Sequence, residues 1–514
     1  MTNQILERLW LGLALCLTLL FTFAVAPDRM TWDQGMDFVG AQQQLAFAAH
    51  VLSGTGSQDF RSIDSNYAYY GIGTTLPAYA LSWLIDVPLG GRFHTYFNSF
   101  TLLLHLFAFL SALAASRLTG ALVKLETGDA HIAEGAAVAL LLVPPWIGYG
   151  FFDYKDMPVA LGVIACVAFA ARCREPDRRA LLLFFAALLF LGAQKLAAVP
   201  LALPACAYVG FHVLRRRNPG EIAAMAGLAL ALPVLLYAVT PPAWREPFAF
   251  AVDNLKTMAA HTHGGCVLTA GECIGRGPAE HPNLYSPLRY IGLWHAAQMP
   301  LGLLALAAVA GGCYVQRQGG GIRHLIAARL AWPLLAIVWN QSTLYDGIRH
   351  TLFLIPLLVA FVFCNIPAPW WRRGARWLAA YGAVLALQIG LMSPYHYVWF
   401  NEAARFYADH RTYVTDYWAF SLGESIASAE RLRRPEDYIV GMPYVLVAPS
   451  FEPARMAASV EAVPPGASYL VIAVTSELPV LPSECTLLSK VQRPQWPSPL
   501  TLDLSLVARC VKPG

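Results

Sequence analysis

Long apolar runs separated by short polar loops make up most of the chain. The first run, residues 9–26, contains no charged residue, and a helix needs about 20 apolar residues to cross the ~30 Å hydrocarbon core of a bilayer. Further runs recur as far as residue 394, so we expect about eleven transmembrane helices in all. The later runs cover residues 95–115, 136–152, 157–171, 180–193, 196–214, 222–244, 290–315, 325–344, 351–369 and 377–394.

Some of these runs allow more than one interpretation. The runs at residues 157–171 and 180–193 are shorter than a usual span and could be partly re-entrant. The first run ends in Ala24-Val25-Ala26, which fits the cleavage site of a signal peptide. Because the run exceeds the roughly 7–15 apolar residues of such a peptide, we favour a retained signal anchor.

Composition and charge support a membrane protein and indicate its orientation. Hydrophobic residues make up 57% and charged residues 13% of the chain, against about 45–50% and 25% in soluble domains. Basic residues cluster in alternate short loops, and such loops are cytoplasmic. We therefore predict a cytoplasmic N-terminus and extracytoplasmic segments at residues 27–94, 245–289 and 395–514. The net charge of +4 gives no indication of a nucleic-acid partner.

The first and last of the extracytoplasmic segments are predicted to be structured. Residues 40–52 and 72–88 are apolar but interrupted, which is typical of helices lying along a membrane surface. The composition becomes polar after residue 394, with an expected helix at 416–432 and strands at 438–442, 468–475 and 501–511. The predicted fold is a polytopic α-helical membrane domain, residues 1–394, followed by a small α/β domain, residues 395–514.

Cysteines in the extracytoplasmic segments suggest disulfides. An even set of cysteines in an oxidising compartment is typical of disulfide bonds, and we expect Cys266 to pair with Cys273 and Cys485 with Cys510. Histidines 261, 263 and 281 lie near the first pair, but their spacing is unlike that of zinc ligands. A disulfide loop is therefore favoured over a metal site.

Two carboxylates, Asp33 and Asp37, directly follow the first apolar run. Burial at the edge of a bilayer can raise the pKa of a carboxylate and make it a general base. Asp33 is the preferred candidate, with Asp37 in support. The alternative for either residue is to cap a helix that lies along the membrane surface.

Three cations, Lys155, Lys195 and Arg349, lie in short loops predicted to be extracytoplasmic, where basic residues are disfavoured. A lipid phosphate would explain them, because a charge pair at ~4 Å contributes roughly 4 kcal/mol at an effective dielectric of 20. Arg349 could bind such a phosphate through two parallel hydrogen bonds from its guanidinium. The alternative for Lys195 is that it binds no ligand and extends its amine from a helix end toward water.

Acidic neighbours provide structural alternatives for two of these cations. Asp153 and Asp156 flank Lys155 and could neutralise it or cap the helix that follows. Asp346 could be a structural partner of Arg349.

Several stretches resemble the GT-C superfamily of polytopic glycosyltransferases, in particular the branch of protein O-mannosyltransferases and aminoarabinose or galacturonic-acid transferases. Asp33-Gln34 resembles the loop motif of that branch, with Gln34 in place of its second acidic residue. Tyr154-Lys155-Asp156-Met157-Pro158 is similar to a Pro-Lys-Asp-x-Pro stretch of bacterial members, with Tyr154 in place of the first proline. Further similar stretches lie at residues 281–285, 345–350, 399–401 and 416–418.

The resemblance implies an enzyme of a bacterial inner membrane that transfers a sugar, with inversion, from a polyprenyl-phosphate donor to an extracytoplasmic lipid, glycan or protein. It implies that Asp33 acts as base, with Asp37 and Asp156 as further catalytic candidates. Lys155, Lys195, Arg349 and His350 are the candidates for binding the donor phosphate, and Asp153, Tyr345 and Asp346 are other site candidates. No cofactor or metal is expected, although carboxylates of this kind could hold a divalent cation.

Other classes of protein fit parts of the pattern. A transporter or flippase of lipid-linked saccharide would favour inverted repeats and charges near mid-membrane, whereas the polar candidates here cluster at helix ends. A catalytically inactive scaffold that presents the C-terminal domain is a further alternative.

Overall fold

The computed structural model describes most of the chain. The described residues are 3–25, 32–54, 59–63, 68–86, 96–259, 267–274, 286–317, 321–441, 451, 455–457, 459–478 and 480–513, except for the side chains of residues 3, 32–36, 62, 86, 96–98 and 259.

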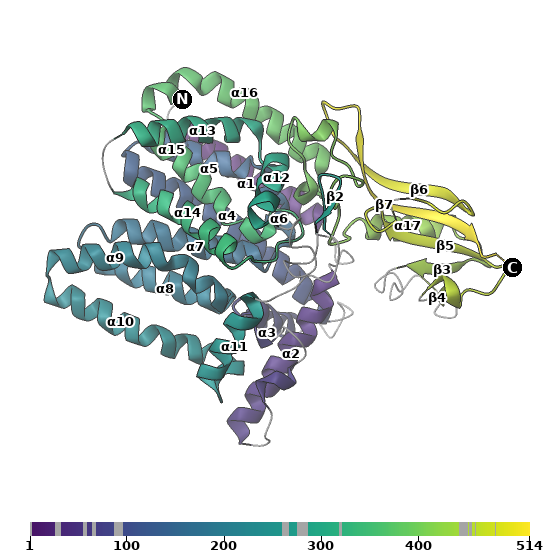
Figure 1. Ribbon diagram of the computed structural model, residues 1–514, viewed down its shortest axis with the longest axis horizontal. Helices are drawn as coiled ribbons and strands as arrows, with labels where there is room; N and C mark the ends of the chain where they lie inside the picture. Colours follow the sequence, from purple (N-terminus) through teal and green to yellow (C-terminus); the bar gives the residue numbers. More distant parts are fainter. Residues whose placement is uncertain are drawn as a thin grey trace.

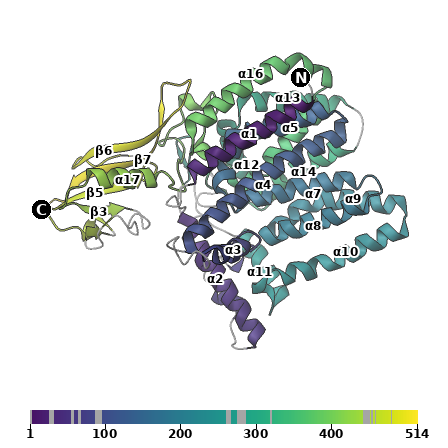
Figure 2. The same ribbon diagram turned by 180° about the vertical axis from the view of Figure 1, so that it is seen from behind.

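Helices dominate the first four fifths of the described chain. They are α1 (Asn3–Ala24), α2 (Trp32–Ser53), α3 (Thr75–Asp86), α4 (Tyr96–Thr127), α5 (Ala130–Leu141), α6 (Pro144–Phe152), α7 (Asp156–Arg172), α8 (Arg178–Gln194), α9 (Leu203–Arg216), α10 (Pro219–Ala238), α11 (Pro247–Ala259), α12 (Pro287–Gln298), α13 (Leu301–Gln316), α14 (Ile322–Trp339), α15 (Leu354–Asn365), α16 (Ala368–Met392) and α17 (Leu422–Leu432). Figures 1 and 2 show most of the longer helices packed as one body, from which α2 and the C-terminal sheet project.

Burial differs sharply between the central and the peripheral helices. Almost every side chain of α7 is buried, whereas α10 buries only Glu221 among its described side chains and exposes Leu230 and Val234 by 75% and 64%. Both helices are apolar on all sides, which suits a bundle interior for α7 and contact with lipid for α10. The protein is therefore a multi-pass membrane protein.

By length and composition, six described helices could cross a membrane, or seven if the bent pair α5 and α6 is one span. Each predicted apolar run overlaps at least one described helix, but the runs at 136–152 and 290–315 are each divided into two helices. Several of the helices are too short to cross a membrane by themselves, so fewer described helices qualify than the eleven expected. Proline accounts for two of the interruptions, because it lacks the amide hydrogen that a continuous helix needs. Pro144 begins α6 after a bend of 64° from α5, and Pro300 separates α12 from α13.

The C-terminal domain is a five-stranded mixed sheet with α17 packed against it. Its strand order is β4-β3-β5-β7-β6, with β3 parallel to β4 and β5, and with β7 antiparallel to β5 and β6. The strands are β3 (Tyr438–Gly441), β4 (Met456–Ala457), β5 (Ser468–Val474), β6 (Cys485–Pro494) and β7 (Thr501–Val511), and a separate hairpin is formed by β1 (Val267–Thr269) and β2 (Glu272–Ile274).

The helix of this domain starts later than the sequence predicts. The predicted start at residue 416 is wrong, because Asp416 and Ala419 have φ angles of +43° and +58°, which no right-handed helix accommodates. The helix begins at Leu422 instead and buries Leu422 and Ala429 against Leu470 of the sheet.

Charged groups fix the C-terminal domain to the end of α16. Arg493 of β6 donates to the carbonyl oxygen of Ser393 at 3.1 Å and pairs with Glu424 at 2.8 Å. The hydroxyl of Tyr395 donates to the same carboxylate oxygen of Glu424 at 2.7 Å. The domain is thus docked on the membrane helices by a shared carboxylate.

Within the C-terminal domain, a disulfide joins Cys485 to Cys510 across β6 and β7. Cys273 is also in a disulfide, whereas Cys266 lies outside the described residues, so their pairing stays a prediction.

Replacing both Cys485 and Cys510 by serine should destabilise the C-terminal domain by about 2–4 kcal/mol, because the bond restricts the unfolded chain. Thermal unfolding of the full chain measures the change in stability, and limited proteolysis shows whether it affects the C-terminal domain. Cys16→Ser, which alters a free and exposed cysteine, is the control and should leave the transition unchanged. Equal transitions for the double variant and the wild type would contradict the expected stabilisation.

Candidate functional site

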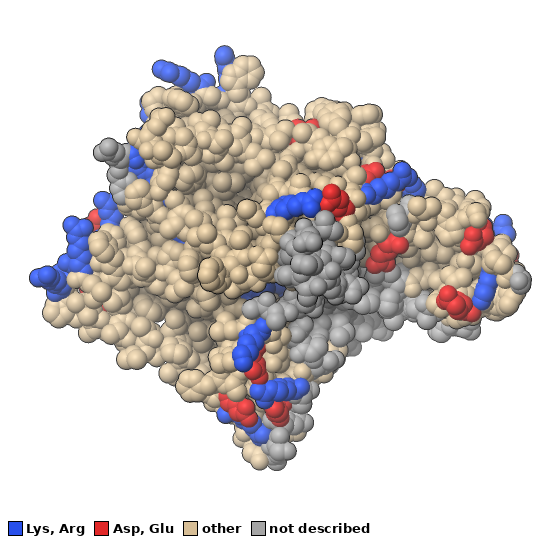
Figure 3. All heavy atoms as spheres, viewed as in Figure 1, with Lys and Arg blue, Asp and Glu red and all other residues tan. Residues whose placement is uncertain are grey.

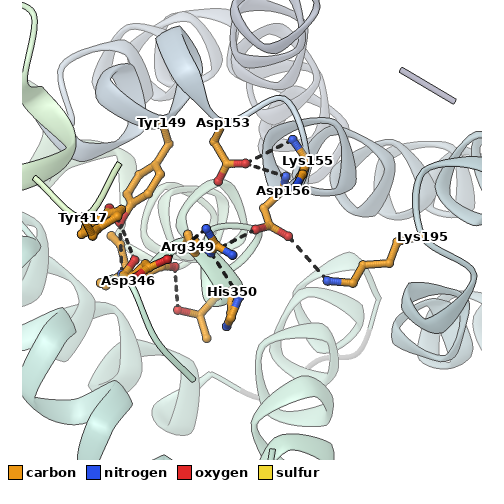
Figure 4. A network of polar contacts seen from close by, with 12 residues as sticks. Tyr149, Asp153, Lys155, Asp156, Lys195, Asp346, Arg349, His350 and Tyr417 are labelled. Carbon is orange, nitrogen blue, oxygen red and sulfur yellow. Dashed lines mark hydrogen bonds and ion pairs between the residues drawn. The ribbon is translucent and has the colours of Figure 1, made fainter. Parts of the chain in front are cut away.

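The predicted site residues meet at one end of the helical bundle. They come from α2, from the turn between α6 and α7 with the first residue of α7, from the end of α8, and from the short 3₁₀ helix η5 (Arg349–Thr351) with the loop that leads into it. Figure 4 shows the side chains from the last three of these segments pointing toward one another. Figure 3 shows other Lys and Arg side chains along the left edge, at the opposite end of the bundle from the C-terminal sheet.

Asp153 organises the turn between α6 and α7. Its carboxylate accepts the backbone N–H groups of Lys155 and Asp156 at 3.2 and 2.8 Å, the bonds by which an aspartate caps a helix. Burial and the neighbouring carboxylate of Asp156 raise the pKa of Asp153. The contacts of Asp153 are therefore those of a helix cap, the structural alternative that its sequence position suggested.

Lys155 and Asp37 form a buried ion pair. The Lys155 amine lies 3.1 Å from the Oδ2 atom of Asp37, whose side chain is 3% exposed. The hydroxyl of Tyr154 donates a short hydrogen bond to the same oxygen, and the Lys155 amine also lies 4.8 Å from the centre of the Tyr70 ring. These contacts attach α2 to the start of α7.

Asp156 lies between the other two cations. One carboxylate oxygen is 3.8 Å from the Lys195 amine and the other is 3.8 Å from Nε of Arg349. Both distances are long for an ion pair, so neither contact has the geometry of a hydrogen bond. Asp156 therefore interacts with both cations through its charge and not through a direct hydrogen bond.

Closer partners hold the guanidinium of Arg349. Its Nη1 atom lies 3.1 Å from the carboxylate of Asp346, and its Nε donates to Nε2 of His350 at 3.2 Å. The ring of Tyr345 lies 4.7 Å from the guanidinium carbon. Arg349 is thereby fixed at the site although its side chain is only 8% exposed.

The structure thus brings nine of the ten predicted catalytic, phosphate-binding and other site candidates into a connected group. They are Asp37, Asp153, Lys155, Asp156, Lys195, Tyr345, Asp346, Arg349 and His350. The tenth, Asp33, belongs to α2 one helical turn before Asp37, but its side chain lies outside the described residues. Among the side chains that the structure describes, no three His, Cys, Asp or Glu residues are gathered as a metal site would require.

Sequence reasoning named Tyr345 but none of the other tyrosines of this region as a site residue. Tyr154 binds Asp37, and the hydroxyls of Tyr149, Tyr290 and Tyr417 contact the loop before Arg349 or each other. A buried tyrosine hydroxyl usually has a hydrogen-bond partner, so tyrosines at or beside the ends of apolar runs, such as Tyr149, Tyr154 and Tyr290, were the available signal. Their partners lie far away in the sequence and could not be deduced from it.

The loop before Arg349 depends on a glycine. Gly347 has a φ angle of +70°, which a residue with a Cβ atom adopts only at a cost. A Cβ atom at Gly347 would also lie 2.7 Å from the hydroxyl oxygen of Tyr149. Both the backbone conformation and the close approach of Tyr149 require glycine here.

Comparisons with known proteins establish no family. No family model matches the chain, and no curated protein matches its sequence. Its fold has a likeness to the crystal structure of ArnT from Cupriavidus metallidurans bound to undecaprenyl phosphate, with 15% identity, a TM-score of 0.48 and coverage of 98% of this chain and 97% of that chain. For the apo state of the same protein the identity is 16%, the TM-score 0.45 and the coverage 98% of each chain. Likeness at this level does not by itself assign an activity.

Gly347→Ala should lower the melting temperature of the protein and weaken the binding of an anion near Arg349, because the loop must move away from Tyr149. We expect a loss of roughly 1–3 kcal/mol in stability, measured by thermal unfolding. Gly311→Ala is the matched control, since Gly311 lies inside α13 with no atom within 4 Å of its added Cβ. Equal melting temperatures for the two variants would show that the loop tolerates a side chain.

Proposed function

We propose that the protein is an inverting glycosyltransferase that moves a sugar from a polyprenyl-phosphate donor to an extracytoplasmic acceptor. The observation that carries this proposal is the position of Asp156, whose two oxygens each face a cation, Lys195 and Arg349, at 3.8 Å. These cations lie at the end of a membrane helix bundle, where the phosphate of a lipid donor would be located. The sequence resemblance to polyprenyl-phosphate-dependent transferases points to the same chemistry.

The donor phosphate would bind between Lys195 and Arg349 and replace their long contacts with Asp156. Cations placed in advance around a leaving group stabilise the negative charge that develops on it in the transition state. Asp156 keeps the two cations close together while no donor is bound. In this proposal Asp156 serves the phosphate site and does not act as the base.

The reaction is a single displacement at the anomeric carbon. The acceptor hydroxyl oxygen forms the new bond to that carbon, the bond from the carbon to the phosphate oxygen breaks, and polyprenyl phosphate leaves with the electron pair. The hydroxyl proton passes to a carboxylate acting as general base. Inversion follows because attack and departure occur on opposite faces of the sugar.

Asp33 is the proposed base. Asp37, the other carboxylate of α2, already accepts a hydrogen bond from Tyr154 and pairs with Lys155, both through its Oδ2 atom. Asp37 is better suited to hold Lys155 beside the phosphate site. Asp33 precedes it by one turn of α2 and so can share this end of the helix.

The proposed setting is a bacterial inner membrane with the N-terminus in the cytoplasm. The basic loop residues, such as Arg215 and Arg216 at the end of α9, would then be cytoplasmic, as their charge favours. The site and the C-terminal domain would face the periplasm, where the acceptor is a lipid, a glycan or a protein.

Asp33→Asn should abolish transfer, with a loss of at least about 100-fold in kcat, because general base catalysis typically contributes 10²–10⁴-fold. Release of labelled undecaprenyl phosphate from a panel of undecaprenyl-phosphate sugars measures the reaction and separates a transferase from a flippase, which does not consume the donor. Asp37→Asn is the comparison and should retain measurable turnover. Full activity of the Asp33 variant would remove Asp33 from the mechanism.

Arg349→Ala should weaken the binding of undecaprenyl phosphate by roughly 10- to 150-fold, the range expected when a charge-assisted hydrogen bond of about 1.5–3 kcal/mol is lost. Titration of the purified full chain with undecaprenyl phosphate measures the dissociation constant. Arg372→Ala alters an exposed arginine of α16 and should bind as the wild type does. An unchanged dissociation constant for the Arg349 variant would exclude this phosphate site.

A further inference from the structure

The backbone that presents Arg349 is held by tyrosine hydroxyls. Asp346 and Gly347 have φ angles of +57° and +70°, and a left-handed conformation at a residue other than glycine costs roughly 1–2 kcal/mol. Such a turn persists only where its surroundings fix it. The hydroxyl of Tyr290, on α12, donates to the carbonyl oxygen of Gly347 at 3.1 Å.

Tyr149, on α6, makes the central contacts with this turn. Its hydroxyl oxygen accepts the N–H of Ile348 at 3.2 Å and lies 3.4 Å from the carbonyl oxygen of Asp346, to which it donates. A tyrosine hydroxyl has a single hydrogen, so the contact with Tyr417 at 2.8 Å is donated by Tyr417. Tyr417 thereby directs the hydrogen of Tyr149 toward the turn.

The position of Tyr417 is set in turn by the segment that leads into the C-terminal domain. The preceding Asp416 is fully buried, and its carboxylate accepts a hydrogen bond from the hydroxyl of Tyr397. It also accepts the N–H groups of Phe420 and Ser421, each at 3.0 Å, and the hydroxyl of Ser421. These bonds fix the left-handed backbone of Asp416 and leave Tyr417 little freedom.

We infer that Tyr417 is a positioning residue for the donor site and acts on Arg349 through Tyr149 and the 346–348 turn. Figure 4 shows Tyr417 and Tyr149 meeting beside Asp346, with Arg349 next to Asp346 on its other side. The segment entering the C-terminal domain is therefore part of the support of the donor site. The inference rests on the proposed function, because it requires that Arg349 bind the donor phosphate.

Removal of the Tyr417 hydroxyl tests the inference with little disturbance to packing. The ring would keep its contacts with Tyr397 and Trp418, at centroid distances of 5.4 and 5.1 Å. The Tyr149 hydroxyl would lose one partner and gain freedom to turn away from Asp346. The loss of a neutral hydrogen bond of about 0.5–1.5 kcal/mol corresponds to a roughly 2- to 12-fold increase in the dissociation constant of undecaprenyl phosphate.

The experiment is a double-mutant cycle on the purified full chain, with undecaprenyl phosphate as the probe. Dissociation constants are measured for the wild type, Tyr417→Phe, Arg349→Ala and the double variant. If Tyr417 acts through Arg349, Tyr417→Phe weakens binding in the wild type but has no further effect once Arg349 is alanine. A merely structural tyrosine would not show this dependence on Arg349.

Tyr381→Phe is the matched control. The hydroxyl of Tyr381, on α16, donates to Glu402 at 2.8 Å and accepts the N–H of Gly302 at 3.1 Å, and neither partner belongs to the donor site. This variant should lower the melting temperature while leaving the dissociation constant unchanged.

The outcomes separate the inference from the proposed function. If Arg349→Ala weakens binding but Tyr417→Phe has no effect, or has the same effect in both backgrounds, the inference is overturned and the proposed phosphate site remains. If Arg349→Ala leaves binding unchanged, the phosphate site itself is refuted, and the inference is refuted with it.

Discussion

Ion pairing among the charges at one end of the apolar helix bundle ties the site together. Removing one partner of a buried ion pair leaves an isolated charge and typically costs about 3–5 kcal/mol. Asp37 on α2 therefore constrains Lys155 at the start of α7, and Asp156 on α7 constrains both Lys195 and Arg349. These ion pairs position segments that are far apart in the sequence. A bound anion would therefore alter the contacts of several segments at once.

Much of this arrangement could be predicted from the sequence because membrane topology restricts where charges occur. The bias of basic residues toward one side made Lys155, Lys195 and Arg349 exceptional before any coordinates were known. Alternation of apolar and polar residues likewise indicated the strand that became β7. These features depend on local composition or on a rule that applies to each loop separately.

Other features depend on contacts between distant segments and could not be predicted. The pairing of Tyr417 with Tyr149 spans 268 residues, and the late start of α17 follows from the left-handed backbone at Asp416. The strand β6 escaped prediction because its burial follows no simple alternation. Its register against β7 shifts twice, between Leu487 and Ser489 and between Val491 and Gln492, which disrupts the two-residue period that sequence reading relies on.

Those register shifts have a consequence for the behaviour of the protein in a crowded membrane. The strand β6 forms one edge of the sheet, and an exposed edge invites pairing with the edge of another molecule. Its irregular register, the exposed charged side chain of Lys490 and the terminal Pro494 all disfavour such pairing. Molecules confined to the same membrane plane meet often, and an edge of this kind makes strand pairing between their C-terminal domains less favourable.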